Sequence, residues 1–136
     1  MSKAIPSIQK FMSNAPYTIG PDQPLALAHT MMREHQIRHL PVLHGGKLVG
    51  MLTARDLALV ETLEGVRPSE TLVEDAMSTN IYQVEPDAPL DEVTSEMAEH
   101  KYGSAVVASN GKVVGIFTTV DACRALTELL HTRLKS

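Results

Sequence analysis

The stretch GKLVGMLTARDL at residues 46–57 decides the fold of this chain, because it recurs as GKVVGIFTTVDA at 111–122. Sliding the sequence by 65 residues lays 8–60 on 73–125 without a gap, and 17 of the 53 aligned positions are identical. Similarity at a fixed offset indicates two copies of one structural unit. We therefore predict a first repeat at 8–60 and a second at 73–125.

Each repeat predicts the element order β-α-β-β-α after a short helical lead-in. The apolar residues Leu25, Ala28 and Met32 have the three-then-four spacing of an amphipathic helix, and the second copy keeps that spacing. A Gly-Gly or Asn-Gly pair between two apolar runs then predicts a tight hairpin. The last helix of each copy should begin at about Ala54 or Thr119. The predicted fold class is α+β.

A single copy of about fifty residues would form a poor core and would leave one face of its sheet exposed. We therefore expect the two copies to pack sheet to sheet with pseudo-two-fold symmetry, so that the whole chain forms one module. Residues 61–72 are polar and contain a glycine and a proline, which predicts a linker. Residues 126–136 are expected to form a helical C-terminal tail.

Composition narrows the classes of function. The chain has 136 residues, and its 16 acidic against 12 basic side chains give a formal charge of −4. An acidic chain without Trp lacks the basic surface and the stacking rings of most nucleic-acid binders, so nucleic acid is not expected as a main partner. No run approaches the ~18 apolar residues of a membrane span, and the stretch MSKAIPSIQK at 1–10 lacks the apolar run of a signal peptide. The single Cys123 excludes an internal disulfide. These features predict a cytoplasmic protein without a membrane partner.

The strand-to-helix junctions Thr53–Asp56 and Thr118–Asp121 permit two interpretations. Ser/Thr followed three residues later by an acid is the pattern of a capping box, which satisfies free amides at a helix start. A helix start is also an anion-binding site, because its free amides and the positive end of its dipole point outward. Both interpretations stay open from the residues alone.

Catalysis and metal binding have little support. The chain has no nucleophile elbow, no Walker loop and no paired carboxylates at a working spacing, so we expect no enzyme and no catalytic cofactor. The histidines His35, His39 and His44 are close in sequence, but their spacing is not that of a zinc site on one helix. No metal site is predicted.

The repeat closely resembles a tandem pair of CBS (cystathionine β-synthase) domains, also called a Bateman module. The resemblance is carried by MSNAPYTIGPDQP at 12–24, IRHLPVL at 37–43 and the segment 46–57, with their counterparts in the second copy. It covers about 8–125, and the G-x-x-T-x-x-D pattern occurs twice. The resemblance implies clefts between the repeats that bind adenosine compounds such as AMP, ADP, ATP, S-adenosylmethionine or NAD. It also implies pairing into dimers.

The resemblance and the chemistry of the residue types together suggest the site residues. Asp56 and Asp121 would accept hydrogen bonds from the ribose hydroxyls, as the acid of dinucleotide-binding folds does. Phosphate would be held by hydroxyl and basic side chains: Thr53, Thr118, Arg38, His39 and Arg55. The adenine slot would be lined by short strand segments: Thr18, Ile19, Pro41, Val42, Gln83, Val84 and Val106. For any one of these apolar residues, plain core packing is the more frequent role.

The sequence therefore favours a regulatory sensor that binds an adenosine-containing ligand and acts through an unknown effector protein or a dimer rearrangement. The alternative is a ligand-free scaffold that keeps the fold and works through dimerisation. Leu126, Leu129 and Leu130 form a stripe at helical spacing. Together with the lead-in around Ile8 and Phe11, this stripe is the candidate surface for a homodimer.

Overall fold

The structure is a computed structural model that describes residues 4–134, and these residues divide into two compact units. One unit is Pro16–Ile81, here called the 16–81 unit. The other joins the N-terminal segment ending at Ala15 to Tyr82 and the residues after it, here called the 82–134 unit. No described helix is long and apolar enough to cross a membrane.

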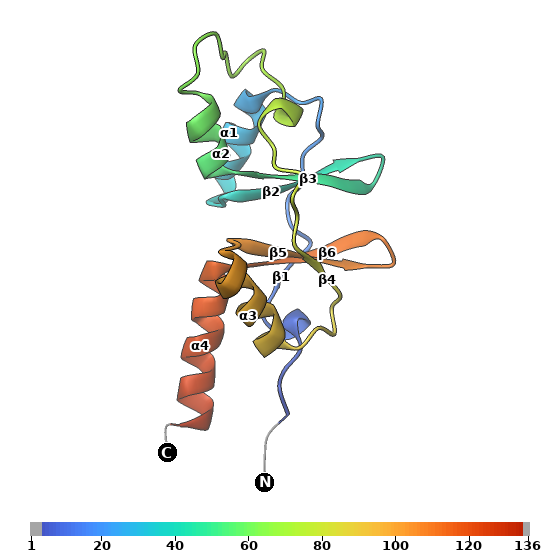
Figure 1. The fold of residues 1–136 in the computed structure, drawn as a ribbon, viewed down its shortest axis with the longest axis vertical. Coiled ribbons are helices and arrows are strands. Elements are labelled where there is room, and N and C mark those ends of the chain that lie inside the picture. The colour runs from blue at the N-terminus through green and yellow to red at the C-terminus, as the bar shows by residue number, and fades with distance from the viewer. Residues whose placement is uncertain (1–3, 135–136) are drawn as a thin grey trace. The chain divides into compact units, whose positions relative to one another are not determined.

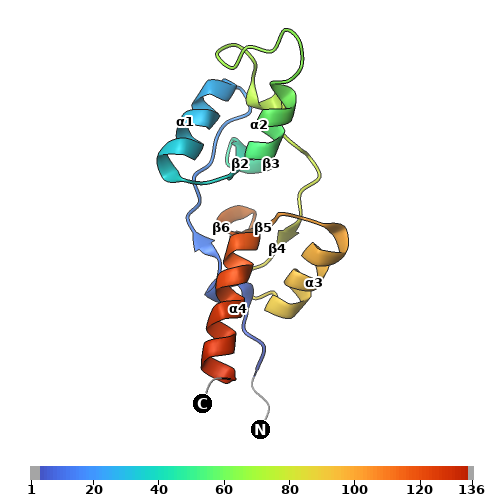
Figure 2. The ribbon, with the colours of Figure 1, turned by 90° about the vertical axis from the view of Figure 1, so that its left-hand side faces the viewer.

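The 16–81 unit is a hairpin covered by two helices. Helix α1 (Leu25–His35) precedes strands β2 (His39–His44) and β3 (Lys47–Thr53), and helix α2 (Ala54–Val60) follows directly. The two helices lie side by side, with α1 against β2 and α2 against β3 (Figures 1 and 2). The opening strand is reduced to one parallel bridge between Ile19 and Val42.

The 82–134 unit repeats this order with a fuller sheet. Its elements are strand β4 (Gln83–Val84), helix α3 (Leu90–His100), strands β5 (Ser104–Ser109) and β6 (Lys112–Thr118), and helix α4 (Thr119–Arg133). β4 pairs parallel with β5, β5 pairs antiparallel with β6, and the sheet order is β1-β6-β5-β4, in which β1 is Ser13–Asn14. The predicted β-α-β-β-α order and the α+β class are therefore confirmed.

Local sequence explains where these elements begin and end. Pro24 and Pro89 precede α1 and α3 in extended conformation, so the fixed φ of proline closes the strand and starts the helix. Both helices end in the left-handed conformation, at Gln36 with φ 53° and at Lys101 with φ 58°. The hairpin turns use positive φ as predicted, at Gly45 and Gly46 and at the corresponding Asn110 and Gly111.

Each unit has its own apolar core, built on the predicted helix faces. Leu25, Ala28 and Met32 of α1 are buried in the 16–81 unit. The corresponding face of α3 is buried beneath β5 and β6 with Phe117, which is fully inaccessible. The core residues of the 82–134 unit are Ile8, Leu90, Val93, Met97, Ala105, Val107, Phe117 and Ala125.

The lead-in segments are exchanged between the repeats. The first lead-in contains the short 3-10 helix η1 (Ile8–Lys10) and belongs to the 82–134 unit, where the Ile8 amide donates to the carbonyl of Ala88 at 2.8 Å. The second lead-in contains η2 (Val73–Asp75) and belongs to the 16–81 unit, where the Val73 amide donates to the carbonyl of Gln23 at 2.8 Å. The compact units therefore cut the chain differently from the sequence repeats.

A glycine lies at the contact that each exchanged segment makes with a strand. Gly115 of β6 lies against Met12, and a Cβ placed on Gly115 would come 2.4 Å from the Met12 sulfur. Gly50 of β3 lies against Met77 in the same way, with the same 2.4 Å. Bare backbone at these positions lets each methionine lie on the strand, which a side chain would prevent.

The proposed dimer surface is only partly available. Ile8 is fully buried in the core of the 82–134 unit and Phe11 is half-buried against it, so the first lead-in is committed to packing within its own unit. On α4, Leu129 packs on that core, whereas Leu126 and Leu130 are exposed. Of the predicted dimer surface, only Leu126 and Leu130 of α4 are exposed among the residues named for it.

Candidate functional site

Both predicted Thr–Asp junctions form complete capping boxes. In the 16–81 unit the Asp56 amide donates to Thr53 Oγ1 at 3.0 Å, and the Thr53 amide donates to Asp56 Oδ2 at 3.0 Å. In the 82–134 unit the Asp121 amide donates to Thr118 Oγ1 at 3.4 Å, and the Thr118 amide donates to Asp121 Oδ2 at 2.9 Å. The structural interpretation of these residues is thus correct for one oxygen of each carboxylate.

The second carboxylate oxygen distinguishes the two copies. Asp121 Oδ1 accepts a hydrogen bond from the Ser13 hydroxyl at 3.3 Å and lies 3.8 Å from Nη1 of Arg124. Asp121 is buried, with 5% of its surface exposed. Asp56 is half-buried, and no hydrogen bond or ion pair joins its Oδ1 to a residue between 4 and 134. Asp56 thus retains an acceptor that Asp121 has already used.

The equivalent positions explain this difference. Ser78 occupies the place of Ser13 in the repeat, but its hydroxyl accepts from the Asn80 amide at 3.3 Å and makes no bond to Asp56. Leu59 occupies the place of Arg124 and offers no charge. Sequence reasoning missed both partners of Asp121. The Arg-for-Leu exchange was visible in the repeat alignment, whereas the serine is common to both copies and gave no signal.

In the 16–81 unit, backbone pairing brings the predicted site segments together. The Ile19 amide donates to the Pro41 carbonyl at 3.1 Å, which places Thr18 and Ile19 along β2. His39 pairs with Thr53 across the hairpin, and the Ala54 amide donates to the Arg38 carbonyl at 2.9 Å. The start of β2, the Ile19 bridge and the capped start of α2 therefore belong to one connected backbone network.

The residues predicted to line adenine slots are mainly core residues by their side chains. Ile19, Pro41, Val42 and Val106 are buried, and Val106 pairs with Gln83 of β4. The more accessible members of the predicted set are Thr18 and Val84, which are half-buried, and Gln83, which is exposed.

Arg38, His39 and Arg55 are basic positions of the first copy that have no basic counterpart in the second. Arg38 and Arg55 are exposed and His39 is half-buried. The same register in the second copy holds Gly103, Ser104 and Val120. An anionic group near a capped helix start would therefore find cationic partners in the 16–81 unit but none at the matching positions of the 82–134 unit.

A groove of about 670 Å³ lies on the 82–134 unit between α3 and the segment that contains β4. Val84 is the only predicted site residue among its lining, which includes the carboxylates of Glu85, Asp91, Glu92 and Glu96. Burial, followed by the nearby Glu96 charge, raises the pKa of the lining Tyr82 above its ordinary value. These carboxylates would repel phosphate, so the groove does not suit a nucleotide.

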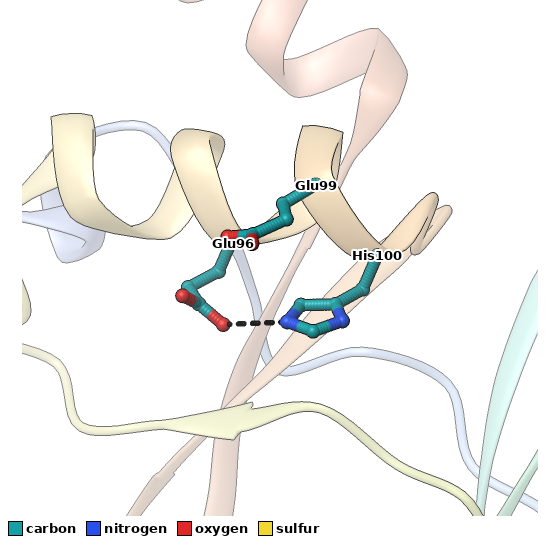
Figure 3. Close-up of side chains that lie close together, drawn as sticks. All are labelled: Glu96, Glu99 and His100. Carbon is teal, nitrogen blue, oxygen red and sulfur yellow. Dashed lines mark ion pairs between the residues drawn. The ribbon is translucent and has the colours of Figure 1, made fainter.

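One cluster on α3 has the side-chain types of a metal site. Glu96, Glu99 and His100 bring ligand atoms within 4.8 Å of one another, and all three are exposed (Figure 3). Glu96 Oε2 and His100 Nε2 are 3.2 Å apart, as an i,i+4 pair on a helix surface places them. The helix spacing by itself accounts for this cluster.

The repeats match a known family along nearly the whole described chain. The CBS-domain model matches residues 8–61 and 73–128. The chain belongs to the CBS-domain family. Among curated relatives of this CBS-domain pair, the CBS domain-containing protein YhcV of Bacillus subtilis is 30% identical over 94% of this chain and 98% of its own length.

Solved structures share the fold of this chain. A protein described as a putative acetoin utilization protein (AcuB) from Vibrio cholerae has a TM-score of 0.87 at 28% identity and covers 98% of both chains. The CBS domain pair of protein MJ0100, solved with 5′-methylthioadenosine and S-adenosyl-L-methionine, has a TM-score of 0.83 at 27% identity over 92% of this chain and 98% of its own. The resemblance stated from the sequence is therefore confirmed.

Proposed function

We propose that this CBS-domain pair is a regulatory module that binds an adenosine-containing small molecule and performs no catalysis. The observation that carries the proposal is the Oδ1 atom of Asp56, an acceptor without a protein partner among the described residues, beside the connected backbone of the β2 start. A ribose diol supplies two hydroxyl donors and suits such a carboxylate oxygen. The adenosine compounds in the MJ0100 structure support the same ligand class.

The other predicted site residues would contact different parts of the ligand. Thr18 is the half-buried member of the predicted adenine set in this unit and would contact the adenine, whereas Ile19, Pro41 and Val42 are buried and would hold that segment in place through their backbone pairing and packing. Thr53 still has its hydroxyl proton to donate, because in the capping box its oxygen acts as an acceptor. Polar or charged groups attached to the ribose would therefore meet this hydroxyl.

Anionic ligands would gain from the basic side chains of this unit. Arg38, Arg55 and His39 offer guanidinium and imidazole donors, which form charge-assisted hydrogen bonds with phosphate. These contacts would favour a nucleotide over a neutral adenosine thioether. Binding would stabilise one conformation of the module, and the free-energy difference between conformations would be passed to an effector protein or a second copy.

A second candidate function is a scaffold that has kept the fold and lost the ligand. The observation in its favour is that both aspartates act as helix caps, a role that needs no ligand. The exposed Leu126 and Leu130 of α4 would then serve a homodimer or a partner protein. This candidate predicts a stable oligomer whose assembly is independent of nucleotide.

Calorimetric titration with 5′-methylthioadenosine, S-adenosylmethionine, AMP, ATP and NAD tests the proposal. Asp56→Asn is the informative variant, because one amide oxygen still caps the helix while the other acceptor becomes a donor. Loss of a hydrogen bond to a charged group costs about 1.5–3 kcal/mol, so we expect binding to weaken by about 10- to 100-fold. Asp75→Asn removes the same charge from an exposed position of the same unit and should leave binding unchanged.

Two results would contradict the proposal. The first is that none of the five compounds binds the parent protein, which would leave the scaffold as the function. The second is that Asp56→Asn binds as tightly as the parent and as Asp75→Asn, which would remove the ribose role of Asp56.

A further inference from the structure

The two aspartates of the repeat differ in what holds their second oxygen. Asp121 is buried, and its carboxylate is reached by four groups of its own unit: the Thr118 amide and hydroxyl at 2.9 and 3.2 Å, the Ser13 hydroxyl at 3.3 Å and the Arg124 guanidinium at 3.8 Å. Asp56 is reached only by the Thr53 amide among the described residues. A carboxylate that already accepts three hydrogen bonds and lies beside a guanidinium gains less from a further donor than one that accepts a single bond.

The pairing of β1 with β6 is what places Ser13 beside Asp121. Ser13 belongs to β1, which pairs with β6 through Ser13–Ile116 and Asn14–Gly115. This pairing fixes the serine next to the β6–α4 junction that carries Thr118 and Asp121. The first lead-in is therefore part of the packing of the 82–134 unit, and its Ser13 hydroxyl also donates a hydrogen bond to the Asp121 carboxylate at the start of α4.

We propose that Ser13 and Arg124 close the second copy of the site, so that only Asp56 is available to a ligand and the chain binds one adenosine compound per monomer. This inference rests on the proposed function for its ligand and on the protein's own contacts for its closed half. Gly103 and Val120 point the same way, since they stand where the first copy has Arg38 and Arg55, and the cation beside Asp121, Arg124, already pairs with that carboxylate.

The stoichiometry of binding is the first readout. Calorimetry of the parent with the tightest of the five compounds should give one molecule per chain. Asp56→Asn should weaken binding at least 10-fold, whereas Asp121→Asn should leave the affinity within about twofold. Two molecules per chain, or a loss of one bound molecule in a folded Asp121→Asn, would overturn the inference while leaving the proposed function intact.

Thermal unfolding without ligand is the second readout, and it does not depend on the proposed function. Asp121→Asn should lower the midpoint by at least about 4 °C more than Asp56→Asn, because Asp121 is buried and its new amide group would face the Arg124 guanidinium, which has no acceptor. Equal midpoints for the two variants would overturn the inference. This comparison tests the contacts of Asp121 separately from ligand binding.

A coupling measurement separates Ser13 from a general packing effect. Ser13→Ala should lower the midpoint in the parent but have little further effect in the Asp121→Ala background, because alanine has no group that could bond to the serine hydroxyl. The matched pair is Ser78→Ala with Asp56→Ala, whose effects should add, since Ser78 bonds to Asn80 instead. Additivity in both pairs would overturn the role of Ser13.

Discussion

Replacing Gly115 by alanine tests whether the exchanged lead-in is fixed by the contact between Met12 and β6. An alanine Cβ at this position would lie 2.4 Å from the Met12 sulfur and 2.9 Å from its Cγ. Non-bonded heavy atoms are at their best separation near 3.5–4.0 Å, so Met12 has to move by about an ångström or more. The methionine is half-buried against the core of the 82–134 unit and would lose part of this packing.

The size of the effect follows from this geometry. Overpacking of a well-packed contact costs about 1–3 kcal/mol of unfolding free energy. Met12 has three rotatable bonds and only side-chain atoms are too close to Gly115, so we expect about 1–2 kcal/mol for Gly115→Ala. Gly50→Ala should cost more, because its Cβ meets the Ser78 carbonyl oxygen at 3.1 Å as well as Met77. That carbonyl is held by the Met51 amide and cannot withdraw as a side chain can.

Urea unfolding of single and double variants measures this coupling. In the Met12→Ala background the alanine at position 115 has space, so the added cost of Gly115→Ala should fall to nearly zero. Met31→Ala is the control, because Met31 belongs to the core of the 16–81 unit and its effect should add to that of Gly115→Ala. If Gly115→Ala costs the same with and without Met12, within about 0.5 kcal/mol, the lead-in is not fixed by this contact.

Two further predictions follow from individual residues. Gln36 and Lys101 end their helices in left-handed backbone, at φ 53° and 58°, a conformation that glycine adopts without strain. We therefore expect Gln36→Gly and Lys101→Gly each to raise the unfolding free energy by up to about 1 kcal/mol in urea unfolding, whereas the control Glu34→Gly within α1 should lower it by about 1 kcal/mol. A loss of stability in the first two variants would contradict the role of these positions as helix ends. Burial and then the Glu96 charge raise the pKa of Tyr82, so near-ultraviolet absorbance should show a phenol that ionises above pH 10.0 and shifts downward in Glu96→Gln. Because the unfolded chain releases this proton first, the unfolding free energy should fall as the pH rises from 10.0 through the folded pKa, a dependence that Tyr82→Phe should remove.

The positions of Thr53 and Asp56 in the fold could be predicted from sequence, because they lie at a strand-to-helix boundary, while their role in a site stays a prediction. The Thr53–Asp56 pattern predicted a capping box and a polar group at a helix start, and the structure has that box. The same pattern at Thr118–Asp121 gave the same prediction, yet Asp121 has its second oxygen filled. The difference arises from Ser13, which is 108 residues away and reaches Asp121 only through the pairing of β1 with β6.

By itself, the sequence determined the repeat, the β-α-β-β-α order and the turns, because these depend on short-range periodicity and on the φ preferences of Gly, Asn and Pro. Only the tertiary structure decided that each lead-in joins the unit of the other repeat. In the structure Met77 lies against Gly50 and Met12 against Gly115, and contacts between residues far apart in the chain leave no periodic signal in the sequence. For the same physical reason, two aspartates with one local pattern have different surroundings.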